Sequence, residues 1–291
     1  MELQQIEYFR VIARTQNISK AAEQLYIAQP SLSQTLKRLE DEIGTPLFDR
    51  RGKHIVLNEA GKIFQKYADE IFRALENSQL EINEYKGNAS AEVNISVESA
   101  SLLLPEIIAR IQRGYPDIKL RIFQSNIKTD VETDLRIYSD FCPCTSSGVI
   151  LMHEPLGAVL PKGHTLAVKE TITAEELQSC EIISLAPHCN LYNIIDHFFQ
   201  ISKLSAEKNI YVDSPAIMRE LLKANLGIAI IPQYTWHEFY NGLLEFRAIS
   251  EPVMSRYIIL AQSNGRYPTS HVNVCQEIII DFFKEYNRKF L

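Results

Sequence analysis

Residues 19–40 read SKAAEQLYIAQPSLSQTLKRLE, a pattern typical of two short helices joined by a tight turn. The second helix begins at Pro30, where a missing backbone N–H costs nothing in the first turn. Small polar and basic side chains share one face of this helix. A helix pair of this kind fits the major groove of DNA. The segment therefore predicts a helix-turn-helix that contacts double-stranded DNA.

Helical patterns on both sides complete a small N-terminal domain. An apolar stripe along Leu3–Arg14 predicts a first helix. We expect Ser19 to cap the second helix and Gly44 to end the third. The buried stripe of the third helix is expected to consist of Leu32, Leu36, Leu39 and Ile43.

A short hairpin is expected next. Residues 47–57 read LFDRRGKHIVL, in which apolar residues flank a turn at Arg51-Gly52-Lys53. Positive charge gathers near this turn, as in the wing of a winged helix-turn-helix.

A long helix is expected after the hairpin. Asn58 can cap it, because nothing interrupts the helical pattern from Glu59 to about Tyr85. About 27 residues would make it about 40 Å long. A stripe at steps of four and three comprises Ala60, Phe64, Tyr67, Ile71, Ala74, Ser78, Glu81 and Tyr85, with Leu75 and Ile82 beside it. The stripe outruns the small domain, so we expect the helix to pair with a second copy; the alternative is packing against this chain's own C-terminal region.

From Val93 onward, strand and helix patterns alternate. We expect strands at 93–97, 120–123, 135–138, 158–160, 182–185, 209–212, 227–231 and 257–260, and helices at 102–112, 174–177, 192–199, 216–224 and 272–286. This alternation predicts an α/β architecture with mostly parallel sheets. Two successive units of the pattern indicate two lobes with a cleft between them.

Charge and composition limit the function classes. The net charge of the chain is −6. Residues 1–58 carry 8 Lys/Arg against 7 acids, and the remainder 22 against 29, so DNA contact is expected at one end only. The start of the chain does not resemble a signal peptide, and no apolar run reaches the ~18 residues of a membrane span. The 5 cysteines are irregularly spaced, which favours a reducing compartment. We expect a cytoplasmic protein that does not bind a membrane.

Catalytic and metal-binding motifs are not found. The sequence has no G-x-S-x-G, H-E-x-x-H, phosphate-binding glycine loop or dinucleotide fingerprint, so an enzyme is not expected. Cys142-Pro143-Cys144 has too few neighbouring ligands for zinc, and no metal or cofactor is expected. A transport-type binding protein would share the two lobes but would need an export signal.

Several segments carry a family resemblance. They are Ala21-Ala22-Glu23 with Leu25, Gln29-Pro30-Ser31-Leu32-Ser33, Leu36, Leu39-Glu40, Gly44-Thr45-Pro46-Leu47-Phe48-Asp49-Arg50 and Leu57-Asn58-Glu59-Ala60-Gly61. Later markers are Leu104-Pro105, Tyr115-Pro116-Asp117, residues 161–166 (PKGHTL) and residues 227–232 (GIAIIP). With these segments in order, the chain resembles the LysR-type transcriptional regulators over essentially its whole length.

The resemblance implies a winged helix-turn-helix, a linker helix for dimerisation and a two-lobed effector domain like that of periplasmic binding proteins. The expected boundaries are 1–58 for the DNA-binding domain, 59–87 for the linker helix, 91–158 with 264–291 for lobe I, and 159–263 for lobe II. Such regulators are usually dimers of dimers, so self-association as a dimer or a homotetramer through helix 59–86 and the effector domains is expected. They bend promoter DNA in response to a small-molecule coinducer, and RNA polymerase is a candidate further partner.

Residues suited to DNA contact gather at the start of the third helix and in the wing. Gln29 and Gln34 could read an adenine edge, whereas Ser31 and Ser33 are better placed for phosphates. The full expected set is Gln29, Pro30, Ser31, Ser33, Gln34, Lys37, Arg38, Arg50, Arg51 and Lys53. For each basic residue the alternative is a solvated surface charge, and for Arg50 it is pairing with an internal carboxylate. Ala28 departs from the family, which often has serine there.

An effector is expected where strands end and helices begin in the cleft, because helix N-termini bind anions. The expected residues are Ser99, Ala100, Ser101, Ser125, Thr129, His188, Cys189 and Asn190. A small carboxylate or other anion is the expected ligand; the alternative is that these residues are ordinary helix caps. Only eleven residues separate Phe123 from Leu135, where the family has a full helix, so the Thr129 side of the pocket is expected to be remodelled.

Two alternative functions remain open. The cleft could bind nothing, which would make the protein a ligand-independent DNA-binding regulator. Cys189 resembles the reactive cysteine of the peroxide-sensing member of the family, and His188 could lower its pKa, which would make a thiol-based redox sensor. Phe198 stands where that member has its partner cysteine, and Cys180 is the other candidate partner.

Overall fold

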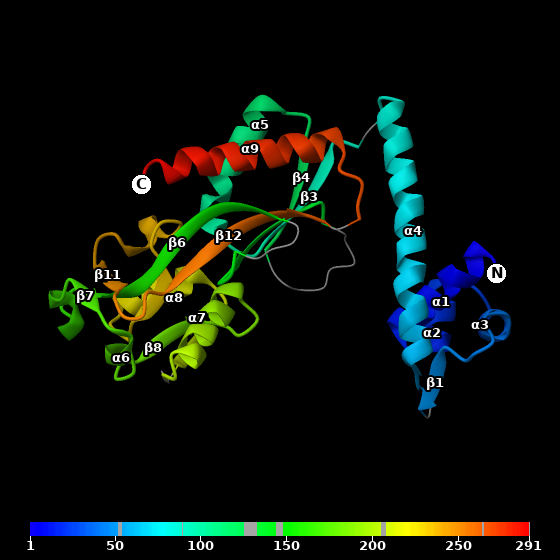
Figure 1. Ribbon diagram of the computed structural model, residues 1–291, viewed down its shortest axis with the longest axis horizontal. Coiled ribbons are helices and arrows are strands. Elements are labelled where there is room, and N and C mark those ends of the chain that lie inside the picture. Colours follow the sequence, from blue (N-terminus) through cyan, green and yellow to red (C-terminus); the bar gives the residue numbers. More distant parts are fainter. Residues whose placement is uncertain are drawn as a thin grey trace. The chain divides into compact units, whose positions relative to one another are not determined.

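The computed structural model describes residues 1–51, 54–88, 90–124, 133–143, 148–204, 208–263 and 265–290. The chain forms two compact units, Met1–Lys86 and Gly87–Leu291, which are described separately (Figure 1). No helix in these ranges is long and apolar enough to cross a lipid bilayer.

The first unit begins with three helices around one apolar core. They are α1 (Leu3–Thr15), α2 (Ile18–Gln24) and α3 (Gln29–Ile43). Phe9, Ile12, Leu32 and Leu39 are fully buried where the helices meet. Pro30 lies in the first turn of α3, and Gly44 ends that helix with φ +83°, as predicted.

The predicted cap of α2 was wrong by two positions. Asn17 precedes the helix in extended conformation, and its Oδ1 accepts a hydrogen bond of 3.1 Å from the Lys20 N–H. Ser19 therefore lies inside the first turn. Asn and Ser are comparable N-caps, so the pattern alone could not choose between them.

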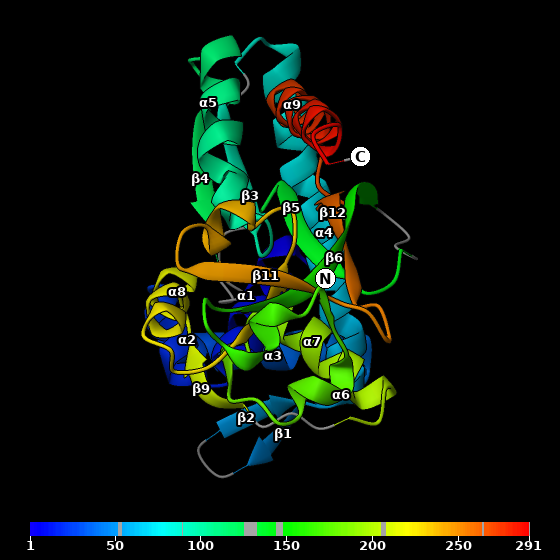
Figure 2. The ribbon, with the colours of Figure 1, turned by 90° about the vertical axis from the view of Figure 1, so that its left-hand side faces the viewer.

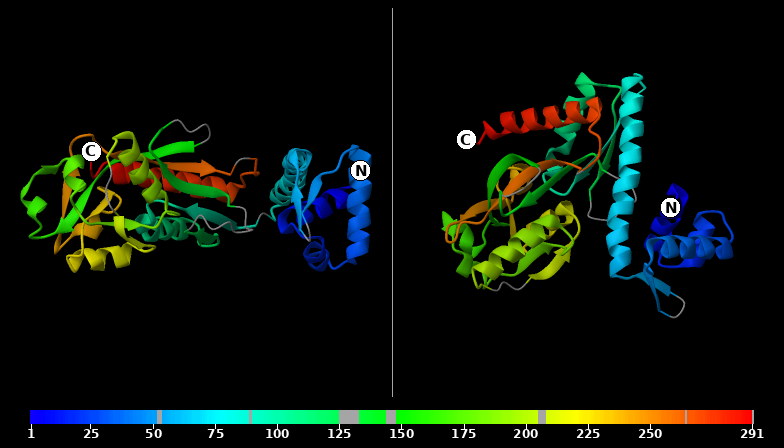
Figure 3. Two further views of the ribbon diagram at one scale, coloured as in Figure 1. Left: turned by 90° about the horizontal axis from the view of Figure 1, so that it is seen from below. Right: turned by 45° about the vertical axis from the view of Figure 1, so that its right-hand side comes forward.

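A hairpin and a long helix complete the first unit. Strands β1 (Phe48–Arg51) and β2 (His54–Leu57) pair antiparallel and project beyond the three helices (Figure 3), which confirms the predicted wing. Helix α4 spans Glu59–Tyr85, the predicted range, and its cap Asn58 accepts a 2.8 Å hydrogen bond from the Gly61 N–H. The first turns of α4 rest on the core of this unit through Phe64 and Ala68.

The second unit is built on an eight-stranded sheet in the order β4-β3-β5-β12-β6-β11-β7, with β10 also paired to β6. Its strands are β3 (Glu92–Val97), β4 (Lys119–Phe123), β5 (Leu135–Asp140), β6 (Gly148–Pro161), β7 (Thr171–Ile172), β10 (Ala229–Pro232), β11 (Leu244–Ile249) and β12 (Ser255–Gln262). A separate parallel pair consists of β8 (Ile182–Leu185) and β9 (Lys208–Val212). The helices are α5 (Leu104–Gly114), α6 (Ala174–Leu177), α7 (Asn190–Ile201), α8 (Pro215–Lys223) and α9 (Ser270–Asn287).

The strand directions correct the expectation of mostly parallel sheets. Strand β3 pairs parallel with β4 and β5, but β12 lies antiparallel between β5 and β6. The long β6 also pairs antiparallel with β10 and β11. The sheet is therefore mixed, because the late strand β12 is inserted between two earlier ones rather than added at an edge.

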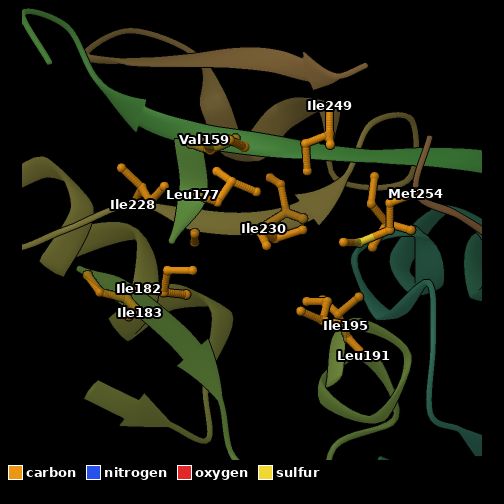
Figure 4. Packing of buried hydrophobic residues seen from close by; sticks show 14 of the residues in the cluster. Val159, Leu177, Ile182, Ile183, Leu191, Ile195, Ile228, Ile230, Ile249 and Met254 are labelled. Carbon is orange, nitrogen blue, oxygen red and sulfur yellow. The ribbon is translucent and has the colours of Figure 1, made fainter. Parts of the chain in front are cut away.

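Two separate apolar cores divide the second unit into two lobes. The first core lies under α5 and α9, two helices that contact each other and lie at the same end of the second unit (Figure 2), and includes Val97, Ile111 and Ile137. The second core, shown in Figure 4, includes Ile183 and Leu191. Strand β6 contributes to both cores, with Met152 in the first and Val159 in the second. The two lobes are thus joined through the sheet itself.

Replacing Gly61 with alanine is expected to lower the thermal stability of the first unit. An added Cβ would lie 2.0 Å from the carbonyl oxygen of Leu47, so the backbone must shift. Such overpacking costs about 1–3 kcal/mol. Differential scanning calorimetry of the full chain measures the loss. Gly114→Ala is the matched control, since nothing lies within 4 Å of a Cβ there. An equal loss in both variants would contradict the steric explanation.

Candidate functional site

The start of α3 presents an exposed polar face. Gln29, Pro30, Ser31 and Gln34 are exposed, and Ser33 is half-buried. The Gln29 Nε2 donates a 3.1 Å hydrogen bond to the Ser33 Oγ. Ala28, at the cap position, makes no side-chain capping bond, because alanine has no side-chain hydrogen-bond acceptor. The structure thus brings these predicted residues together on the first turns of one helix.

The basic residues of α3 are not neutralised by the acids that follow them. Lys37 and Arg38 are exposed. The Glu40 Oε1 accepts a 2.7 Å hydrogen bond from the Leu47 N–H. The Glu42 carboxylate pairs with the N-terminal ammonium group, which lowers the pKa of Glu42. Glu40 and Glu42 are thus engaged elsewhere. Within the described ranges no ion pair joins Lys37 or Arg38 to Asp41, so both cations remain available to a polyanion.

The wing residues are only partly described. Arg50 and Arg51 lie on β1, and the backbone of Arg51 pairs with that of His54. The side chains of Arg50 and Arg51 and the whole of Lys53 lie outside the described residues. Their contact with DNA stays a prediction.

A cavity of about 280 Å³, lined by both polar and apolar side chains, lies between the two lobes of the second unit. Val97 and Ala100 line it from the first core, and Leu185 and Leu191 from the second. The predicted residues that line this cavity are Ser99, Ala100, Ser101, His188, Cys189 and Asn190. Ser125 and Thr129 lie outside the described residues. The segments predicted from strand ends therefore do meet at one site.

Asn190 joins the two lobes at the cavity. Its side-chain Oδ1 accepts hydrogen bonds from the Ser99 Oγ at 3.0 Å and the Ser139 backbone N–H at 3.1 Å, and it also contacts the Ser139 Oγ. Because a backbone N–H can only donate, the atom facing Ser139 is the amide oxygen. The Asn190 Nδ2 is consequently directed elsewhere, and it has no partner within the described ranges.

Arg256 lines the same cavity and was missed by sequence reasoning. It lies on β12 directly opposite Glu154 of β6, and the two side chains are 2% and 0% exposed. Their closest atoms, Arg256 Nη2 and Glu154 Oε1, are 2.8 Å apart. The sequence did contain a signal for Arg256, since a lone arginine beside the apolar run 257–260 is unusual. The predicted strand, however, began at Tyr257, whereas β12 begins at Ser255, so Arg256 fell just outside the prediction.

The hydrogen bonds of this buried pair can be counted. Glu154 also accepts from the backbone N–H groups of Tyr234 and Thr235 and from the Thr235 hydroxyl. Arg256 donates to Glu154, to the Thr235 Oγ1 at 3.1 Å and to the Ser139 Oγ at 3.3 Å. A guanidinium has five N–H donors. In the part of the chain that the structure describes, one N–H on Nη1 of Arg256 is left without a partner.

Other donors surround the cavity. Helix α7 begins at Asn190, and its cap residue Cys189 makes no side-chain capping bond. The first backbone N–H groups of a helix have no partner within the helix and carry partial positive charge. Of the acids at the cavity, Glu98 has both oxygens engaged by Arg136, while Asp213 is exposed with its Oδ1 3.5 Å from the His188 Nε2. Hydrogen-bond donors are thus concentrated around Asn190, Arg256 and the start of α7, and within the described ranges the Asn190 Nδ2 and one N–H of Arg256 have no partner.

The thiol of Cys189 lacks the environment of a reactive cysteine. Burial, and after it the nearby charge of Asp213, raise the pKa of Cys189. A reactive cysteine needs a lowered pKa, because the thiolate is the nucleophile. Cys180 donates to the Glu176 carbonyl oxygen and lines a different cavity. The raised pKa of Cys189 does not favour redox sensing through this thiol. The placement of Cys180 at a different cavity does not favour it either.

A winged helix-turn-helix followed by a two-lobed unit with a cavity between the lobes defines a DNA-binding regulator with an effector-binding domain. Residues 3–62 match the family described as bacterial regulatory helix-turn-helix protein, lysR family. Residues 86–284 match the LysR substrate binding domain. The chain belongs to the LysR family of transcriptional regulators, which are not enzymes.

Individual relatives agree. The chain is 28% identical to the uncharacterised HTH-type transcriptional regulator YybE of Bacillus subtilis (strain 168), over 98% of this chain and 100% of that one. It is 29% identical to the Hca operon transcriptional activator HcaR of Escherichia coli (strain K12), over 91% and 93%. The crystal structure of full-length CbnR complexed with its target DNA matches with a TM-score of 0.59 at 17% identity, over 98% and 100%, and shares the fold.

Replacing Glu154 with glutamine is expected to lower the free energy of unfolding by about 3 kcal/mol, because a buried guanidinium would lose its counter-charge. Urea denaturation of the full chain, followed by circular dichroism, measures the loss. Glu220→Gln is the control: its carboxylate pairs with Lys223 but is 70% exposed, so less than about 0.5 kcal/mol is expected. Similar losses in both variants would show that burial of the Glu154–Arg256 pair does not increase its contribution to the free energy of unfolding.

Proposed function

We propose that this regulator binds promoter DNA through α3 and the wing, and that a small anionic metabolite in the cavity between the lobes modulates that binding. The observation that carries the proposal is the set of donors at this cavity: the Asn190 Nδ2 and one N–H of Arg256, which have no partner within the described ranges, and the N-terminus of α7. Donors of this kind at a helix N-terminus favour a carboxylate or similar anion.

The proposed DNA interface combines base-reading and phosphate-binding side chains. Gln29 and Gln34 have amide groups that can form paired hydrogen bonds with adenine. Lys37, Arg38 and the wing cations would bind the backbone, which sets affinity rather than sequence preference. The protein would act in the cytoplasm, where promoter DNA is found.

Self-association is proposed through α4 and the effector domains. On the side that does not pack on the core of the first unit, and along most of its length, α4 exposes a line of apolar side chains: Ile63, Tyr67, Ile71, Leu75, Ile82 and Tyr85. Steps of four and three place them along one side, as in a helix pair. Dimers formed this way, with the effector domains joining dimers into a tetramer, would place several DNA-binding domains on one promoter. RNA polymerase would then be the further partner that responds.

The proposed mechanism is a shift in lobe closure. Asn190 already bonds the second lobe to Ser99 and Ser139 of the first. An anion that binds donors of both lobes favours whichever degree of closure lets it reach both. Closure would change the spacing of DNA-binding domains in the assembly, and so the bend imposed on the promoter.

The effector hypothesis is tested by titrating the full chain with a panel of mono- and dicarboxylates while following its thermal midpoint. A ligand present at about 100 times its Kd should stabilise the protein by about 2.7 kcal/mol. DNase footprinting with the best ligand should then show a changed footprint and bend. A footprint unchanged at saturating ligand would overturn the mechanism, and indifference to the whole panel would favour ligand-independent regulation.

Asn190→Asp should weaken carboxylate binding by at least about tenfold, because the Nδ2 donor becomes a second anionic oxygen. The bonds that Asn190 accepts from Ser99 and Ser139 can persist. Asn193→Asp, an exposed position on the same helix, adds the same charge and should leave affinity within about twofold. Isothermal titration calorimetry compares the two, and equal weakening would remove Asn190 from the binding site.

Gln34→Ala should weaken binding to a specific site by about 1–3 kcal/mol while leaving non-specific binding nearly unchanged, because a base contact is lost. Electrophoretic mobility shifts use duplexes that the wild-type chain selects from a random pool, and an unrelated duplex of equal length. Gln200→Ala, on an exposed position of the second unit, is the control. If specific and non-specific affinities fall together, Gln34 does not read a base.

A further inference from the structure

The turn between α2 and α3 has a defined backbone pattern. The Ile27 N–H donates to the Ala22 carbonyl oxygen at 3.0 Å, and the Tyr26 N–H donates to the Glu23 carbonyl oxygen at 3.2 Å. Tyr26 itself has φ +54°, in the left-handed region. This pair of bonds with a left-handed residue is the Schellman motif that ends many helices.

Tyrosine is a poor choice for this position. The left-handed residue of the motif is usually glycine, because a Cβ crowds the following carbonyl oxygen there. In the same unit α3 ends at Gly44 with φ +83°, whereas α1 ends at Gln16 with φ +50°, so glycine is used at one left-handed helix end and not at the other. Local backbone preference therefore does not explain Tyr26.

Packing does not explain Tyr26 either. Its side chain is 96% exposed. Within the described ranges its ring and hydroxyl make no hydrogen bond, ring stacking or cation–π contact, whereas the next residue, Ile27, packs against the core and fixes the turn. The backbone directs the side chain of Tyr26 outward, and within the described ranges no other side chain holds the phenol in place. A residue that breaks a local rule without a compensating contact marks a functional position.

The surroundings of Tyr26 point to one function. Helix α3 begins at Gln29, whose side chain, like that of Ser31, is exposed. In a helix-turn-helix the second helix enters the major groove by its N-terminal residues while the first crosses the sugar–phosphate backbone. The turn between them then lies over the phosphates at the edge of the groove. A tyrosine hydroxyl is among the neutral donors that bind phosphate oxygens.

We propose that Tyr26 binds the DNA backbone, its hydroxyl donating a hydrogen bond to a phosphate at the edge of the groove that α3 enters. The proposal rests on the proposed placement of α3. The left-handed backbone sets the direction of the Cα–Cβ bond of Tyr26, and the side chain that follows it is exposed. The ligand is a phosphodiester of double-stranded DNA, and the contact carries no sequence preference.

Two variants of the full-length protein test this. Tyr26→Phe removes only the hydroxyl, and Tyr26→Asn removes the ring while placing at φ +54° a residue that adopts this conformation readily. Each should weaken binding about fivefold per DNA-binding domain, the worth of about one hydrogen bond. The loss should be equal for pool-selected and unrelated duplexes, and the salt dependence should not change, because no charge is removed. Tyr115→Phe, an exposed phenol of the second unit, is the control.

Thermal midpoints separate contact from structure. Tyr26→Asn should leave the midpoint unchanged or raise it by a few degrees, since a strained position is relieved. Unchanged DNA affinity in both variants would overturn the proposal, as would a fall in the midpoint that parallels the loss of affinity. A loss confined to pool-selected duplexes would also overturn it, because a base contact would then be at work. The Gln34→Ala result tests the placement of α3 separately, so failure of that placement is recognised independently of Tyr26.

Discussion

The second unit depends on one buried ion pair. Glu154 and Arg256 face each other on β6 and β12, the strands that run between its lobes, and both are removed from water. Isolated buried charges are very costly, so these two residues must face each other in the native register. A slip of one residue in β12 would turn Arg256 to the opposite face of the sheet and bring Tyr257 inward. The register fixed by this pair also places Ser139 within reach of Asn190 and thereby helps to shape the cavity.

Much of the fold follows from local sequence. Helix α4 could be predicted from Glu59 to Tyr85 because a good cap precedes an unbroken helical period. Strand directions could not be predicted in this way, since the periodicity of a strand does not encode which strand lies beside it or whether the two run parallel. The short β7 and the strand β11 were also missed. Strand β7 has 2 residues, too few for any alternation to be visible.

The cavity between the lobes was predictable in part for a clear physical reason. Ser99 and Asn190 lie where a strand ends and a helix begins, and such positions meet at the edge of an α/β sheet. Arg256 and Ser139 lie within strands, where sequence reasoning expects packing. Their hydrogen bonds depend on tertiary pairing between residues 117 positions apart. Local patterns therefore identified Ser99 and Asn190 at the cavity but not the buried Arg256 that also lines it.

The insertion of β12 between β5 and β6 also has a consequence for synthesis of the protein. Residues 1–86 contain every contact of the first unit, so that unit can fold while the rest of the chain is still on the ribosome. The facing edges of β5 and β6 stay open until β12, beginning at Ser255, has emerged. During that interval the nascent chain presents unpaired strand edges, the kind of surface on which chains aggregate and chaperones act. During each round of translation the first unit can therefore fold well before the second, because the sheet of the second unit is completed only after β12 has been synthesised.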